Sequence, residues 1–190
     1  MEPVTLTTER LLLRAFVPAD SEEVRAACQD PGIQRWIPVP TPYEREHADE
    51  FVGRTVPDGW RTDTAYTFSV RLREGGPLLA SASLHHPREG AWEIGFYTVG
   101  EHRGRGYATE TVLGLARWAF TELGSARLEW RAQVGNTGSR TVAERAGFTV
   151  EGVLRSAMDH RGTMRDCWVA SLLPSDLGLP GSRPYLPAGN

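Results

Sequence analysis

Lysine is absent from this chain of 190 residues, and all 21 of its basic residues are arginines. A mechanism that uses a lysine nucleophile or a lysine Schiff base is therefore excluded. Positive charge is not in surplus either, since the net charge is −3 at pH 7. General nucleic-acid binders usually carry a basic surplus, so the composition argues against this class and leaves only a local arginine patch open.

Cysteine and metal-ligand patterns are scarce. Cys28 and Cys167 lie far apart without metal-ligand spacing, so we expect reduced packing residues, with a disulfide as the alternative. His85 and His86 are adjacent, which suits neither a helical ligand pair nor a zinc set. The sequence therefore predicts no metal cofactor.

Long hydrophobic runs are missing as well. No apolar run approaches the roughly 20 residues that cross a bilayer, and residues 1–4 do not begin a signal peptide. We therefore expect a cytoplasmic protein without a membrane partner. With 40% hydrophobic and 24% charged residues, the composition is that of a globular protein, which at this size buries roughly 70% of its unfolded surface. We predict one domain over residues 1–173 and a Pro/Gly-rich tail without regular structure over 174–190.

Hydrophobic periodicity and turn residues predict an α+β fold around a central sheet. The expected strands cover residues 10–16, 65–72, 77–85, 91–99, 126–134, 148–156 and 166–173. The expected helices cover 20–29, 41–56, 107–123 and 137–146, and residues 31–40 are expected to be irregular. A capping box of Asp20 and Glu23 should open the first helix, and Pro42 should occupy the first position of the second.

The most informative stretch is Arg103-Gly104-Arg105-Gly106-Tyr107-Ala108, which follows a predicted strand and precedes a predicted helix. Glycines leave consecutive backbone N–H groups free to converge on an anion, and the following helix adds its unpaired N-terminal amides. The stretch therefore indicates a phosphate-binding turn. The alternative is a tight turn with solvated arginines, because the ending of a P-loop and a complete dinucleotide-binding fingerprint are both lacking.

A second strand-to-helix junction repeats this pattern over residues 128–139. Asn136 is placed to cap the following helix, and Gly147 to be the left-handed residue just past its end. Ser139 falls in the first helical turn, where its hydroxyl can face the carboxyl ends of two strands. The alternative for Ser139 is a secondary capping role.

The Arg-x-x-Gly-x-Ala spacing at Arg103, Gly106 and Ala108 resembles the acetyl-CoA pyrophosphate-binding motif of the GNAT superfamily of N-acetyltransferases. Further stretches resemble the RimJ/RimL-like subfamily, which acetylates protein N-terminal amines and includes ribosomal-protein alanine and serine acetyltransferases. These stretches are Leu6 to Arg14, Trp92 to Tyr97, Arg103 to Glu110, Asn136 with Ser139, Gly147-Phe148, Glu151-Gly152, and Gly162 with Arg165-Asp166. The resemblance implies a GNAT fold, with a mixed, mostly antiparallel sheet of about seven strands flanked by about four helices and splayed between the fourth and fifth strands.

The resemblance also implies acetyl-CoA as co-substrate, held by its pyrophosphate at the Gly-rich turn and by its pantetheine arm between the splayed strands. It implies a bulge at Tyr97 to Val99 whose freed N–H polarises the acetyl carbonyl. The alternative is that these residues simply end an edge strand. The expected cofactor-binding residues are Tyr97, Thr98, Val99, Arg103, Gly104, Arg105, Gly106, Tyr107, Ala108, Thr109, Asn136 and Ser139.

Acetyl transfer needs a neutral amine, so a base is expected near the acceptor. Glu93 alternates with apolar residues along its strand and so points to the other side of the sheet from them. By resemblance, Glu93 lies where related enzymes keep a strand carboxylate near the acceptor amine. A structural carboxylate is the alternative, and Glu151 and Asp159 are the other candidate bases. Ser139 is the expected general acid toward the departing thiolate, with Tyr97 as the alternative.

We therefore predict an N-acetyltransferase that moves an acetyl group from acetyl-CoA to a primary amine, with a protein N-terminal amine first among the acceptors. An aminoglycoside or other small amine comes second, and a non-catalytic acyl-CoA-binding or sensing module is the alternative from another class. The acidic helix at 44–50 either has a solvated face or attracts a cationic amine, and a homodimer remains open. The expected acceptor groove includes Trp36, Ile37, Tyr43 and Trp60.

Overall fold

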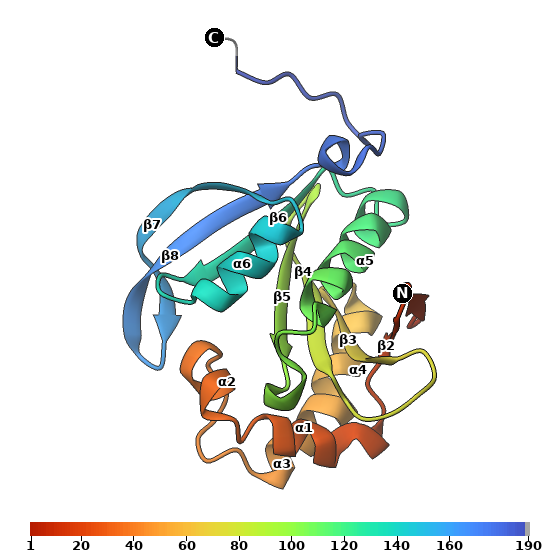
Figure 1. The fold of residues 1–190 in the computed structure, drawn as a ribbon, viewed down its shortest axis with the longest axis vertical. Helices are drawn as coiled ribbons and strands as arrows, with labels where there is room; N and C mark the ends of the chain where they lie inside the picture. The colour runs from red at the N-terminus through yellow and green to blue at the C-terminus, as the bar shows by residue number, and fades with distance from the viewer. Residues whose placement is uncertain (189–190) are drawn as a thin grey trace.

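The computed structural model describes residues 1–188. Its centre is an eight-stranded sheet in the order β1-β2-β3-β4-β5-β6-β8-β7 (Figure 1). The strands are β1 (Leu6–Thr7), β2 (Leu11–Ala15), β3 (Ala65–Leu72), β4 (Ala80–Arg88), β5 (Ala91–Thr98), β6 (Arg127–Gln133), β7 (Thr149–His160) and β8 (Thr163–Leu172). All neighbouring strands are antiparallel except β5 and β6, which are parallel. The predicted α+β class and mixed sheet are confirmed, with the short β1 as an additional strand.

The sheet splays open between β5 and β6. These two strands pair only from Ala91 with Arg127 to Ile94 with Trp130. Beyond that point β5 continues to pair with β4 as far as Thr98, while β6 continues with β8 as far as Gln133. The carboxyl halves of the two parallel strands therefore diverge, as the sequence comparison with the GNAT fold predicts. The opening faces the lower end of the molecule in Figure 1.

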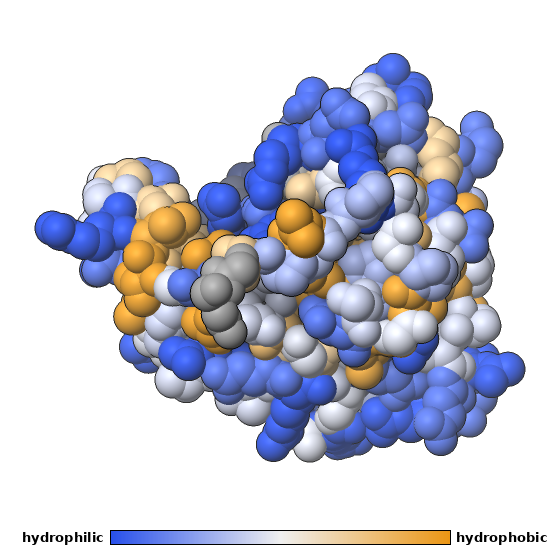
Figure 2. Space-filling model, turned by 90° about the horizontal axis from the view of Figure 1, so that it is seen from above, coloured by the Kyte–Doolittle hydropathy of each residue, from blue (hydrophilic) through white to orange (hydrophobic). Residues whose placement is uncertain are grey.

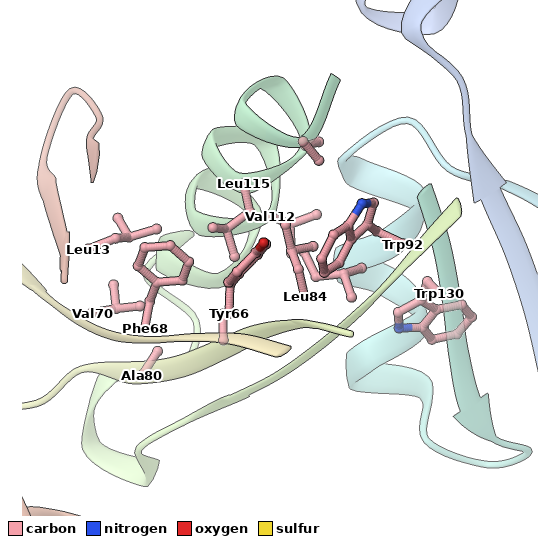
Figure 3. Close-up of a cluster of buried hydrophobic side chains, with 14 of the residues drawn as sticks. Leu13, Tyr66, Phe68, Val70, Ala80, Leu84, Trp92, Val112, Leu115 and Trp130 are labelled. Atoms are coloured by element: carbon pink, nitrogen blue, oxygen red, sulfur yellow. The ribbon is translucent and has the colours of Figure 1, made fainter. Parts of the chain in front are cut away.

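The main hydrophobic core lies between the sheet and α5 (Tyr107–Thr121). Figure 3 shows Leu13, Phe68 and Trp92 pointing from their strands toward the helix. Tyr66 and Trp92 stack with ring centroids 4.9 Å apart, a geometry that favours aromatic pairs beyond the area they bury. We call this side of the sheet the α5 face. Because side chains alternate along a strand, Glu93, Gly95 and Tyr97 belong to the opposite face.

The other helices lie around both faces. α4 (Val56–Thr62) packs on β3 through Trp60 on the α5 face, and α6 (Thr137–Arg145) follows β6. α1 (Ser21–Ala27) covers the opposite face, where the Arg71 guanidinium of β3 pairs with Asp20 and Glu23. The remaining elements are α2 (Pro31–Trp36), α3 (Arg45–Glu50), the π-helical turn η2 (Phe51–Thr55), and the 3₁₀ turns η1 (Pro18–Asp20), η3 (Gly100–His102) and η4 (Pro174–Leu177).

Three local predictions in the N-terminal half are wrong. Residues 31–36 are not irregular but form α2, because the Asp30 carboxylate accepts the Gly32 N–H at 2.7 Å and caps the helix. The next helix begins at Arg45 instead of Pro42, and helical structure continues through η2 and α4 beyond Val56. The capping box does not form, because the carboxylates of Asp20 and Glu23 are engaged by Arg71.

The C-terminal half matches the prediction more closely. α5 and α6 lie at the expected residues, whereas β7 and β8 extend further and form a hairpin that projects from the body (Figure 1). Figure 2 shows hydrophobic surface on this projection, whose exposed apolar side chains include Val153, Leu154 and Met164. The tail is not wholly irregular, since η4 is a short 3₁₀ turn. No helix within residues 1–188 is long and apolar enough to span a bilayer.

Candidate active site

A cavity of 390 Å³ occupies the splay between β5 and β6. Three parts of the chain meet there: the Gly-rich turn before α5, the first turn of α6, and α2 with the residues after it. Ligand pockets commonly have this size and form where the strands of a sheet part. The lining includes Gly32, Ile33, Trp36, Ile37, Phe96, Tyr97, Thr98, His102, Arg103 to Thr109, Gly135 to Ser139, Val142 and Arg145.

The Gly-rich turn places backbone donors at one end of the cavity. Gly104 and Gly106 have φ of 76° and 80°, a left-handed conformation that glycine adopts without strain. Gly106 is the N-cap of α5, so the N–H groups of Tyr107 to Thr109 lie in the first turn, where a helix has no internal acceptors for them. This combination of a left-handed turn and a helix N-terminus suits an anionic group.

The two arginines of this turn differ in their partners. The Arg103 guanidinium donates to Asp30 at 2.5 Å and to the Thr98 carbonyl at 3.1 Å, so its charge is compensated. Arg105 has no carboxylate within 4.0 Å among the residues that the structure describes. Arg105 is therefore the uncompensated cation of the turn, while Arg103 fastens α2 to it.

Backbone groups of β5 point into the splay. Val99 donates its N–H to the Leu79 carbonyl at 3.0 Å, so alternate residues of β5 bond to β4. The intervening N–H groups of Phe96 and Thr98 consequently point toward β6, beyond the last β5–β6 pair. The predicted bulge at Tyr97 to Val99 is wrong, because the β4–β5 register is regular there and irregular only between His85 and Arg88. The divergence of the strands frees the N–H groups that the bulge was expected to free.

Ser139 and Asn136 lie together at the start of α6, as predicted. The Asn136 side chain accepts the Ser139 N–H at 3.3 Å and caps the helix. The Ser139 hydroxyl oxygen accepts a hydrogen bond of 3.0 Å from the indole N–H of the buried Trp130. Because the indole can only donate, the hydroxyl hydrogen of Ser139 stays available to a group in the cavity.

Glu93 lies on the opposite face from Ser139, next to the last paired position before the splay. Burial raises the pKa of the Glu93 carboxyl above its ordinary value, and the Arg131 guanidinium, 3.6 Å away, opposes this shift. Gly95, two residues along the same face, is exposed and has no atoms within 4 Å of the place where a side chain would begin. The half-buried carboxylate therefore borders open space.

The other candidate acid and base residues are less suitably placed. Glu151 pairs with Arg127 at 2.5 Å, which lowers the pKa of its carboxyl. Asp159 accepts the Gly162 N–H in the β7–β8 turn. Burial raises the pKa of the Tyr97 hydroxyl above its ordinary value, which disfavours ionisation of this side chain. Within the described residues, no three side chains of the kinds that ligate metals cluster together.

The expected acceptor groove is only partly correct. Trp36 and Ile37 line the cavity. Tyr43 and Trp60 do not, because both are buried, Trp60 among the aromatic residues between α4 and α5. Sequence reasoning missed the wall contributed by Ile33, although the Asp-Pro-Gly start of α2 carries a helix-capping signal.

A family model described as "Acetyltransferase (GNAT) domain" matches residues 10–149. The chain belongs to the GNAT acetyltransferase family. This GNAT enzyme is an acetyl-CoA-dependent N-acetyltransferase, and its cavity has the backbone donors and free cation that a pyrophosphate-bearing thioester requires.

Relatives of this GNAT enzyme span nearly its whole length. It is 28% identical over 171 residues to "Uncharacterized N-acetyltransferase p20" of Bacillus licheniformis, covering 89% of this chain and 96% of the relative. RimJ of Mycobacterium smegmatis, solved with CoA-disulfide, has a TM-score of 0.81 at 18% identity over 96% of this chain and 94% of its own. RimL, titled a ribosomal L7/L12 alpha-N-protein acetyltransferase and solved with coenzyme A, has a TM-score of 0.79 at 18% identity over 90% and 98%. At these identities the two solved structures establish a shared fold.

Proposed function

We propose that this GNAT enzyme acetylates the α-amine at the N-terminus of a cytoplasmic protein. The observation that carries the proposal is the position of Glu93, on the sheet face opposite to the cavity wall formed by α5 and α6, beside the open surface at Gly95. A thioester entering the splay from one face would meet an amine approaching from the other. The names of the RimL and RimJ relatives support an N-terminal protein acceptor.

The Gly-rich turn would bind acetyl-CoA through its pyrophosphate. The backbone N–H groups of Gly104 to Thr109 and the uncompensated Arg105 are the donors, and Arg103 contributes by holding α2 against the turn. The pantetheine arm would lie along the free backbone edge of β5, with Thr98 and Val99 at its thioester end and Asn136 beside it on α6. Recognition through backbone groups needs few particular side chains.

Acetyl transfer would then use groups on both faces. The neutral amine attacks the thioester carbon, forming the C–N bond, and Glu93 accepts the proton that the amine loses. The N–H groups of Phe96 and Thr98 stabilise the oxyanion of the tetrahedral intermediate. Its collapse breaks the C–S bond, and Ser139 donates a hydrogen bond to the departing thiolate. A thiol has a pKa of about 8.5, so the thiolate leaves with modest assistance.

A screen of acceptors tests the proposal. Thiol release from acetyl-CoA is measured with N-terminal peptides, polyamines and aminoglycosides, using the wild-type enzyme and Gly95→Leu. We expect turnover with peptides, its loss in Gly95→Leu with unchanged acetyl-CoA affinity, and normal turnover in the control Gly152→Leu, another strand glycine with open space around it. Turnover with small amines alone would overturn the peptide assignment. Tight acetyl-CoA binding without turnover on any amine would favour an acyl-CoA-binding module.

A further inference from the structure

A second hollow of 890 Å³ lies on the other side of the Gly-rich turn, between α5 and the N-terminal segment that contains β1. Gly106, Thr109 and Arg145 line both this hollow and the cavity in the splay. The two spaces are therefore adjacent across the first turn of α5. The remaining lining residues are Thr5, Leu6, Thr7, Thr8, Glu9, Glu110, Leu113, Gly114 and Arg117.

Two arginines of the second hollow have uncompensated charge. Arg117 of α5 and Arg145 at the end of α6 are exposed, and neither has a carboxylate within 4.0 Å among residues 1–188. Arg10 differs, because it pairs with Glu110 at 2.6 Å and donates to the Arg105 carbonyl. Since Arg10 and Glu110 neutralise each other, Arg117 and Arg145 are the cations left to attract an anion.

The chemistry of acetyl-CoA supplies an anion at this place. Its pyrophosphate joins the pantetheine arm to a ribose that carries a 3′-phosphate and an adenine. With the pantetheine arm in the splay, the ribose must leave the turn on the other side, where the second hollow begins. We propose that Arg117 and Arg145 bind the ribose 3′-phosphate, so that the enzyme distinguishes acetyl-CoA from 3′-dephospho-acetyl-CoA. This inference rests on the proposed binding of the pyrophosphate at the Gly-rich turn.

The surroundings of the two arginines fit this assignment. Guanidinium groups bind phosphate oxygens through paired, charge-assisted hydrogen bonds. Leu6 and Leu113 add apolar surface to the same hollow, on which a base can pack. The hollow is open to solvent, so binding through long arginine side chains requires no rearrangement of the backbone.

Calorimetry with two thioesters tests the inference. Dissociation constants for acetyl-CoA and 3′-dephospho-acetyl-CoA are measured on the wild type, Arg117→Ala and Arg145→Ala. The wild type should bind acetyl-CoA about tenfold or more tightly than the dephospho form, which corresponds to one charge-assisted contact. Each variant should weaken acetyl-CoA binding severalfold while changing the dephospho form by less than about twofold, since the coupling is specific to the phosphate.

Control variants separate this site from general electrostatics. Arg155→Ala removes one positive charge from an arginine of β7 that also has no carboxylate within 4.0 Å among the described residues, and should leave both affinities unchanged. Arg145→Lys should restore part of the preference for acetyl-CoA. Equal wild-type affinity for the two thioesters would overturn the inference and leave the proposed function standing. Failure to bind either thioester would overturn both.

Discussion

At the scale of single residues, the two groups proposed for proton transfer lie on opposite faces of one sheet. Ser139 is fixed by two local contacts, the cap from Asn136 and the hydrogen bond from Trp130. Glu93 is fixed by its strand and by Arg131. Such supporting contacts limit side-chain movement, which is the condition for a precise reaction geometry.

Replacement of Glu93 by glutamine keeps size and hydrogen bonding but removes proton affinity. We expect turnover to fall by about 10²-fold or more near neutral pH and to recover partly at high pH, where the amine is already neutral. The pH dependence of turnover in Glu93→Gln and wild type measures this directly. A loss of equal size at every pH would indicate a structural role for the carboxylate.

The same substitution has a predicted effect on stability. Because burial raises the pKa of Glu93 in the folded state, the contribution of this group to stability is complete at low pH and is lost as the pH rises through the folded pKa. Relative to wild type, Glu93→Gln should therefore gain thermal stability as the pH rises from about 4 to 8. Melting temperatures across that range check the sign, and a relative loss with rising pH would contradict it.

Ser139→Ala should slow catalysis more than it weakens binding. Loss of a hydrogen bond to a developing anion costs roughly 1.5–3 kcal/mol, which is about one to two powers of ten in turnover. The effect should shrink with a thioester of a more acidic thiol, because that thiolate needs less assistance. Abolished acetyl-CoA binding with intact saturated turnover would instead make Ser139 a binding residue. Turnover and dissociation constants are compared for both thioesters.

Residue roles differ in how far the sequence alone predicts them. Strand alternation predicts the face of Glu93, and the spacing after Asn136 predicts the position of Ser139, since both depend on local geometry. The burial of Trp60 and the pairing of Arg103 with Asp30 depend on segments distant in the sequence. Local patterns carry no information about such contacts.

At the scale of elements, the junction between the Gly-rich turn and α5 governs cofactor binding. Gly106→Ala forces a Cβ into a left-handed position, which costs roughly 1–2 kcal/mol and shifts the N–H groups of the first turn. We expect a large loss of acetyl-CoA affinity by calorimetry in a protein that still folds. The matched control is Gly124→Ala, whose φ of 63° imposes similar strain just after α5; its affinity should be unchanged. Equal losses in the two variants would contradict a specific role of the turn.

α2 forms one wall of the cavity and depends on Asp30 in two ways. Asp30 caps the helix and pairs with Arg103. Asp30→Ala should lower the free energy of unfolding by about 1 kcal/mol through loss of the cap, whereas Asp30→Asn keeps a capping side chain and loses only a partly exposed ion pair, worth about 0–1 kcal/mol. Urea unfolding of both variants tests this order. Equal destabilisation would show that the ion pair, and not the cap, holds α2.

Long periodic elements are predictable from the sequence, and short ones are not. α5 has the length and apolar spacing that define a helix, so its limits follow from local pattern. α2 has six residues and begins at a proline, so its cap at Asp30 is its main local signal. The end of α1 is decided by tertiary contacts, because Arg71 takes the carboxylates that would otherwise form a capping box.

At the scale of the whole molecule, the splay divides the work between two faces. One face, with α5, α6 and two adjacent hollows, is suited to a long anionic thioester. The opposite face carries Glu93 beside open surface at Gly95 and is suited to an amine. The projecting β7–β8 hairpin adds exposed apolar side chains such as Leu154 and Met164.

The most direct measurement is the position of the acetyl group in the product. A peptide with a free α-amine and an internal lysine is incubated with the enzyme and acetyl-CoA, and fragment mass spectrometry locates the modification. The account predicts acetylation on the α-nitrogen, with no product when that amine is blocked beforehand. Acetylation on the lysine side chain, or no acetylated peptide despite saturating acetyl-CoA, would contradict it.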